Sequence, residues 1–148
     1  MPNPQQLAML TDLADERHDR AAKKLARALS MLKDSESRLA LLQDYCADYH
    51  ARLAQSAASG VAPAELRNYR EFIARLEEAI AQQRTEVEAL NKGVADCRTG
   101  WMLERRRKQS YAVLIDRADL ATREVEARRL QKLVDEFAGR AAALRVAV

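Results

Sequence analysis

Four residues of this chain have side chains suited to metal or redox chemistry, namely Cys46, Cys97, His18 and His50. In a hairpin folded near Gly60 the two cysteines would lie far apart, so no intrachain disulfide is expected. Neither histidine pairs with a cysteine at a recognised ligand spacing, which leads us to predict no metal site and no cofactor. Both thiols are expected to be buried structural groups.

Other catalytic and nucleotide-binding arrangements are missing from the sequence. The four glycines are scattered and match neither the phosphate-loop nor the dinucleotide-binding spacing. Carboxylates are plentiful, but helix faces offer no water-excluded cleft in which they could act as an acid and a base. The basic run from Arg105 to Lys108 has no interleaved aromatics, which argues against nucleic-acid binding. We predict a protein that is not an enzyme.

Composition favours long solvated helices over a compact core. Charged residues make up 32% of the 148 residues and aromatic residues only 5%, with a net charge of +3. No segment approaches eighteen consecutive apolar residues, and no secretion signal begins the chain. We expect a cytoplasmic protein that does not insert into a membrane.

The elements that would position any site are two long helices. From Leu66 to Val125 no proline interrupts the chain, and steps of three and four residues meet apolar side chains at all but four positions. This pattern is typical of a coiled-coil seam, and a helix over that segment would span roughly 90 Å. A similar seam runs from His18 to Leu53, with a stutter expected at Leu10, Ala14 and His18.

Turn and cap signals divide the chain into helix one at about 4–57, a turn at 58–62 and helix two at about 63–144. Asn3, Pro4 and Gln6 form a capping box, while Gly60 and Pro63 end one helix and begin the next. The short linker predicts antiparallel helices in which residue i lies opposite roughly residue 120 minus i.

The predicted fold is therefore all-α, a rod-like antiparallel two-helix coiled-coil hairpin forming a single domain over 1–148. The register places the acidic residues of 12–19 opposite the basic run of 105–108. Helix two must overhang, and its end carries an apolar stripe without an intramolecular partner. That stripe comprises Leu130, Leu133, Phe137, Ala141 and Leu144.

The apolar face near Tyr69 is wider than a two-helix seam requires. Four positions, spaced at i, i+4, i+7 and i+11, are predicted to lie along its open edge as a partner-binding site: Phe72, Leu76, Ala79 and Gln83. The alternative is that Phe72 only lies over helix one near the turn.

The run from Asn68 to Ile80 closely resembles the corresponding run of the FliJ family, the soluble stalk component of the bacterial flagellar export apparatus. Further similar pieces follow the family order along almost the whole chain. They are Leu7 to Ala14, Leu39 to Tyr45 with Tyr49, Gly60, Trp101 and Asp135 to Ala138.

The resemblance implies a stalk-like coiled coil whose terminal end, Asp116 to Val148 with the start of helix one, enters the hexameric ring of the export ATPase and promotes its assembly and activity. It also implies contact with export chaperones and with the cytoplasmic domain of the export-gate membrane protein. The positions matching the gate-binding surface are Phe72, Leu76 and Ala79. Gln83 departs from the family, whose members can carry His there. The implied location is the flagellar base, peripheral to the inner membrane.

Two other functions stay open at the level of sequence. A stalk of a needle-type secretion system would have the same physics, although Phe72 after Asn68 and Tyr69 favours the flagellar version. A self-associating coiled-coil chaperone or scaffold would use the stripe from Leu130 to Leu144 to join copies, whereas the stalk is expected to be a monomer when free.

Overall fold

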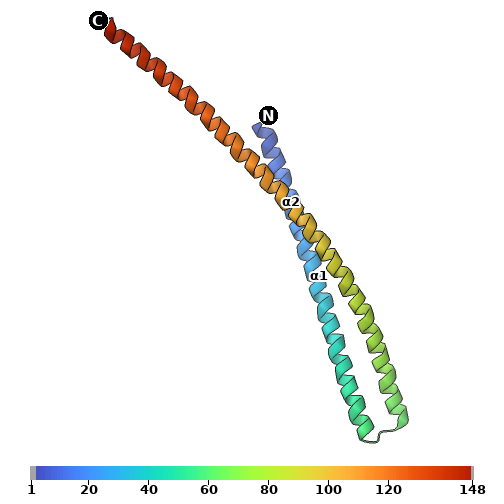
Figure 1. Cartoon of the computed structure of the whole chain (residues 1–148). Coiled ribbons are helices and arrows are strands. Elements are labelled where there is room, and N and C mark those ends of the chain that lie inside the picture. Colours follow the sequence, from blue (N-terminus) through green and yellow to red (C-terminus); the bar gives the residue numbers. More distant parts are fainter. Residues whose placement is uncertain (1–2, 148) are drawn as a thin grey trace. The chain divides into compact units, whose positions relative to one another are not determined.

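The computed structural model describes residues 3–147 and contains two helices joined by a short turn (Figure 1). Helix α1 spans Pro4–Ala58 and helix α2 spans Pro63–Val146. No strand occurs among the described residues, and the predicted all-α hairpin is confirmed. Neither helix has an apolar stretch, within the described part, long enough to cross a membrane.

Local hydrogen bonds explain where the helices begin and end. The Asn3 side-chain oxygen accepts a bond of 2.7 Å from the Gln5 amide, and the Asn3 amide donates to Gln6 Oε1 at 3.2 Å, as a capping box requires. At the end of α1, the Val61 amide donates to the Ser56 carbonyl and the Gly60 amide to the Ala57 carbonyl. This Schellman motif needs a left-handed residue, and Gly60 supplies it with φ of 76°.

The described chain forms two units, one of residues 19–103 and one of residues 3–18 with 104–147. In the first unit, α1 and α2 lie side by side and antiparallel on either side of the turn (Figure 1). Its core is formed by Cys46, Ile73 and Ile80, packed against Leu39, Leu42, Tyr49, Leu53 and Leu76. Every one of these residues occupies a predicted seam position.

One polar pair lies inside this seam. Ser35 is 2% exposed, and Gln83 Nε2 donates to its Oγ at 2.7 Å and to its carbonyl oxygen at 3.1 Å. The two residue numbers add to 118, close to the predicted register of 120. A buried polar pair of this kind favours one alignment of the helices, because any shift would leave both groups without partners.

In the second unit, the N-terminal part of α1 buries Leu7 and Ala14. Thr11, rather than Leu10, is the half-buried residue between them, so the three-four steps continue through Leu7, Thr11, Ala14 and His18. The predicted stutter is therefore wrong. Thr11 fits the seam because its Oγ1 donates to the Leu7 carbonyl at 2.8 Å, which satisfies the hydroxyl within the helix.

In this unit the acidic segment 12–19 was predicted to lie opposite the basic run 105–108. One ion pair joins the two segments, with Lys108 Nζ 3.5 Å from Asp15 Oδ1. The seam of α2 ends at Ala118, and the predicted seam positions Thr122 and Val125 are exposed. Thr122 still lines a hollow with Pro4 and Leu7 of α1. Val125 lies one helical turn further along α2, past the start of α1 at Pro4.

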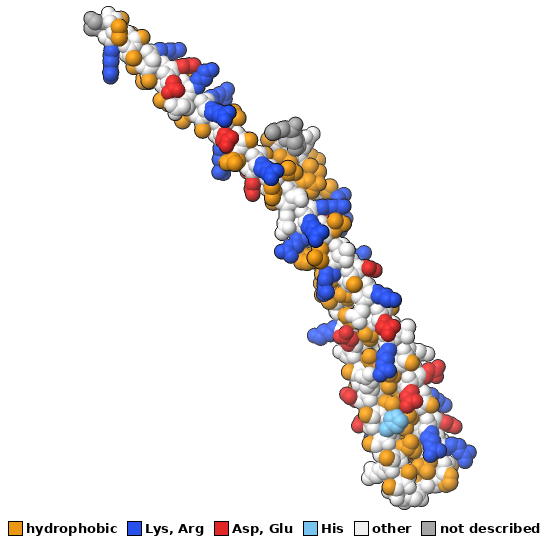
Figure 2. All heavy atoms as spheres, in the orientation of Figure 1, with side chains coloured by type: hydrophobic (Ala, Val, Ile, Leu, Met, Phe, Trp, Pro, Cys, Tyr) orange, Lys and Arg blue, Asp and Glu red, His pale blue; other side chains and the backbone are white. Residues whose placement is uncertain are grey.

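All α2 residues from Asp119 to Arg140 are exposed. The apolar stripe of this overhang includes Leu130 at 67%, Leu133 at 58%, Phe137 at 76% and Leu144 at 71% exposure. Acidic and basic side chains are interspersed with apolar ones over the visible face of both helices (Figure 2).

Candidate docking surface near the turn

The predicted edge of α2 begins with Phe72, which is 40% exposed although it contacts α1. Its ring centroid lies 4.4 Å from that of Tyr49, with an interplanar angle of 52°. Tyr49 also lies 6.3 Å from Tyr69, centroid to centroid. Phe72 therefore does lie over helix one, as the alternative interpretation held, but it keeps a large exposed fraction.

Leu76 and Ala79 follow Phe72 on the same flank of α2, and both are half-buried. Leu76 packs against the core cluster of Cys46, Ile73 and Ile80. Both residues thus present part of their surface to solvent and use the rest to hold the helices together.

Gln83 does not continue this edge. Its amide points into the seam and donates to Ser35, so the side chain is engaged between the helices. The predicted position on the open edge is wrong for Gln83, because a hydrogen-bonding partner on α1 draws the side chain inward. An i+11 spacing could not distinguish these two directions.

Helix α1 also contributes to this surface, which the sequence prediction left out. A groove of about 300 Å³ is lined by Tyr45, Asp48, Tyr49, Arg52, Phe72 and Leu76. Tyr45 is 50% exposed, and the Arg52 guanidinium lies 5.2 Å from the Tyr49 ring centroid, in the range of a cation–π contact. The signal in the sequence was the row Tyr45, Asp48 and Arg52, which follows one flank of the seam.

A second hollow lies on the side toward the turn and has a volume of about 450 Å³. Its lining residues are Tyr49, Glu65, Asn68, Tyr69 and Phe72. Tyr49 and Phe72 line both hollows, so the tilted ring pair forms a ridge between them. We call the residues Tyr45, Tyr49, Tyr69, Phe72 and Leu76 the aromatic surface.

The aromatic surface has the properties of a binding site for another protein. Aromatic rings with an arginine beside them are enriched among residues that dominate binding energy at interfaces. Exposed apolar groups spaced by three and four residues can pack against a partner helix or a shallow groove. The charged groups at its margin, Asp48, Arg52 and Glu65, can add orientation through complementary charge.

Comparison with known proteins supplies the family. A model of the family described as Flagellar FliJ protein matches residues 3–146. The chain belongs to the FliJ family. It is 35% identical to a Flagellar FliJ protein of Salmonella typhi and 33% identical to one of Escherichia coli strain K12. Each alignment covers 136 residues, 92% of this chain and 92% of the relative.

The match includes both helices, and with them the aromatic surface and the C-terminal overhang. The resemblance inferred from the run at Asn68 to Ile80 is thereby confirmed. As a member of the FliJ family, the chain is a component of the flagellar export apparatus.

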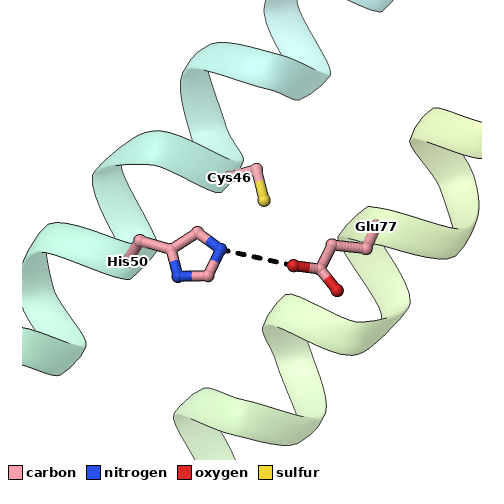
Figure 3. A group of neighbouring side chains, drawn as sticks. All are labelled: Cys46, His50 and Glu77. Carbon is pink, nitrogen blue, oxygen red and sulfur yellow. Dashed lines mark ion pairs between the residues drawn. The ribbon is translucent and has the colours of Figure 1, made fainter.

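This FliJ-family chain also holds a cluster that the sequence analysis rejected. Cys46 and His50 lie one helical turn apart on α1, and Glu77 of α2 faces them (Figure 3). The prediction that neither histidine pairs with a cysteine is wrong, because a spacing of four residues brings both side chains to the same side of a helix. Only the pairing of the two helices could add the carboxylate.

Proposed function

We propose that this chain is the stalk-like subunit of the flagellar export apparatus, which enters the hexameric ring of the export ATPase and promotes its assembly and activity. The observation that carries the proposal is the family match from residue 3 to residue 146, which spans the hairpin and the overhang. The exposed stripe of Leu130, Leu133, Phe137 and Leu144 offers the apolar contacts that a ring interior would cover.

In this proposal, the aromatic surface binds the cytoplasmic domain of the export-gate membrane protein. Phe72 supports it as the anchor, because its ring is 40% exposed yet held in place by Tyr49. Leu76 and Ala79 would extend the contact along α2. Gln83 supports the surface only indirectly, by holding Ser35 and the register of the two helices.

The same proposal includes contact with export chaperones and a location on the cytoplasmic side of the inner membrane at the flagellar base. The free chain is proposed to be a monomer that binds no nucleic acid. In support of the last point, Lys108 lies 3.5 Å from Asp15 and Arg107 lies 3.2 Å from Glu104, so part of the basic run already has acidic partners.

The test measures two activities of the purified chain, stimulation of the cognate export ATPase and binding to the gate protein's cytoplasmic domain. Phe72→Asp places a charge on the ridge and should lower gate binding by at least about 30-fold, equivalent to about 2 kcal/mol for a central anchor. It should leave ATPase stimulation unchanged, since the overhang is separate from this residue in the sequence.

Val113→Asp is the matched control, because Val113 is 48% exposed on α2 and lies outside the aromatic surface. It should bind the gate domain like the wild type. If the wild type neither stimulates the ATPase nor associates with its ring, the stalk proposal is wrong. A wild-type dimer in sedimentation would then favour the self-associating scaffold, which the exposed stripe also suits.

A further inference from the structure

Three side chains of the kinds that bind metal ions converge between the two helices on one flank of the seam, namely Cys46, His50 and Glu77 (Figure 3). One ligand atom from each residue lies within 4.8 Å of the other two. His50 Nε2 is 3.3 Å from Glu77 Oε1, so the imidazole lies beside the carboxylate. A thiol, an imidazole and a carboxylate thus meet at one point without belonging to the aromatic surface.

We propose that Cys46, His50 and Glu77 form a binding site for Zn²⁺. Sulfur, imidazole nitrogen and carboxylate oxygen are the three protein donors that zinc uses, and three of them leave a fourth position for water. A mixed set with a thiolate and an imidazole favours zinc over magnesium or calcium, which prefer oxygen donors.

The geometry needs only a small contraction. With zinc–ligand bonds of about 2.0–2.3 Å, neighbouring donors in a tetrahedron lie roughly 3.3–3.7 Å apart. The present separations of up to 4.8 Å close to this range by rotation of side chains. His50 and Glu77 are free to rotate, because their side chains are 53% and 59% exposed.

The buried thiol shields one side of the site from solvent. Cys46 is 8% exposed and belongs to the core cluster with Ile73 and Ile80. The metal would therefore approach from solvent, bind His50 and Glu77, and meet the sulfur at the edge of the core. Binding replaces the thiol proton, which is released to water, so affinity must fall as the pH is lowered.

A bound ion would join α1 to α2 through protein ligands. At 100° per residue, His50 and Glu77 lie on the flank of each helix opposite the flank that carries Tyr45 and Phe72. Zinc would thus restrain separation of the helices at the level of the aromatic surface without covering it. The inference does not depend on the proposed export function.

The experiment uses the full-length, untagged and reduced chain with Co²⁺ as a spectroscopic probe. We expect one Co²⁺ per chain, a thiolate-to-metal charge-transfer band, and visible bands of the intensity typical of tetrahedral cobalt. Zn²⁺ should displace the cobalt and remove both signals. His50→Gln and Glu77→Gln alter exposed side chains, so they should fold normally and weaken Co²⁺ binding by more than about 10-fold.

Cys46→Ser should remove the charge-transfer band, whereas the matched control Cys97→Ser should keep it. Circular dichroism of each variant shows whether the helices are intact. The proposal is overturned if no charge-transfer band forms, if Cys97→Ser rather than Cys46→Ser removes the band, or if His50→Gln and Glu77→Gln bind cobalt like the wild type. A stoichiometry of one ion per two chains would equally overturn it, since the site lies within one chain.

Discussion

At the scale of single residues, the hydrogen bond from Gln83 to Ser35 turns into the seam a side chain whose spacing predicted an exposed position. Gln83 continues the spacing of Phe72, Leu76 and Ala79, but its amide donates to a residue that is only 2% exposed. The proposed docking edge is consequently shorter along α2, and Tyr45 and Tyr49 of α1 line the adjoining groove.

This pairing predicts the effect of Gln83→Ala. The substitution removes the amide that donates hydrogen bonds to the hydroxyl and carbonyl oxygens of buried Ser35. The free energy of unfolding should therefore fall by about 1–3 kcal/mol. Urea unfolding measures the change. Gate binding by the folded variant should match the wild type, and a selective loss of gate binding at unchanged stability would return Gln83 to the docking edge.

The companion variant Ser35→Ala with Gln83→Leu replaces both polar groups by apolar ones. It should recover the stability lost in Gln83→Ala, because no buried group lacks a partner. If the pair fixes register, spin labels placed across the seam should show a broader distance distribution in the double variant than in the wild type. An unchanged distribution would assign register to the remaining seam residues.

At the scale of elements, the glycines separate into two kinds. Gly60 has φ of 76° and ends α1 in a conformation that other L-residues rarely adopt. Gly93 and Gly100 lie within α2, and a Cβ added at either would meet no atom within 4 Å. The turn requires its glycine, whereas the helix interior does not.

Substitution by alanine should therefore have opposite signs. Gly60→Ala should lower the free energy of unfolding by about 1–2 kcal/mol, the cost of a left-handed L-residue. Gly93→Ala should raise it by about 0.5–1 kcal/mol, because alanine favours the helix and the site has room. Urea denaturation under matched conditions compares the unfolding free energies of the two variants. ATPase stimulation by Gly93→Ala tests whether function needs the lower helix stability that glycine gives at this position.

At the scale of the whole molecule, the overhang of α2 adds exposed surface rather than core. Its residues from Asp119 to Arg140 are all exposed, including Leu130, Leu133 and Phe137 of the stripe. Truncation after Glu126 should therefore leave the urea midpoint of the hairpin close to that of the full chain.

The same truncation separates the proposed function from its alternative. If the stripe enters an ATPase ring, the truncated chain should lose stimulation while both forms sediment as monomers. If the stripe joins copies of this chain, the full chain should sediment as a dimer or larger and the truncated one as a monomer. A truncated chain that stimulates fully would contradict the role proposed for the overhang.

The sequence by itself determined the two helices, their capping, the turn and the register. These follow from local or repeating features, such as Asn3 with Gln6, Gly60 before Pro63, and an apolar seam whose steps leave one way to pair the helices. The sequence could also predict the edge formed by Phe72, Leu76 and Ala79, because all three residues share one face of one helix.

Only the tertiary structure decided what each seam or edge residue meets on the other helix. Spacing along α2 cannot show that Ser35 draws Gln83 inward, that Tyr49 supports Phe72, or that Glu77 completes a triad with Cys46 and His50. Periodicity specifies the face on which a side chain lies, whereas its direction within that face depends on hydrogen-bond and packing partners distant in sequence.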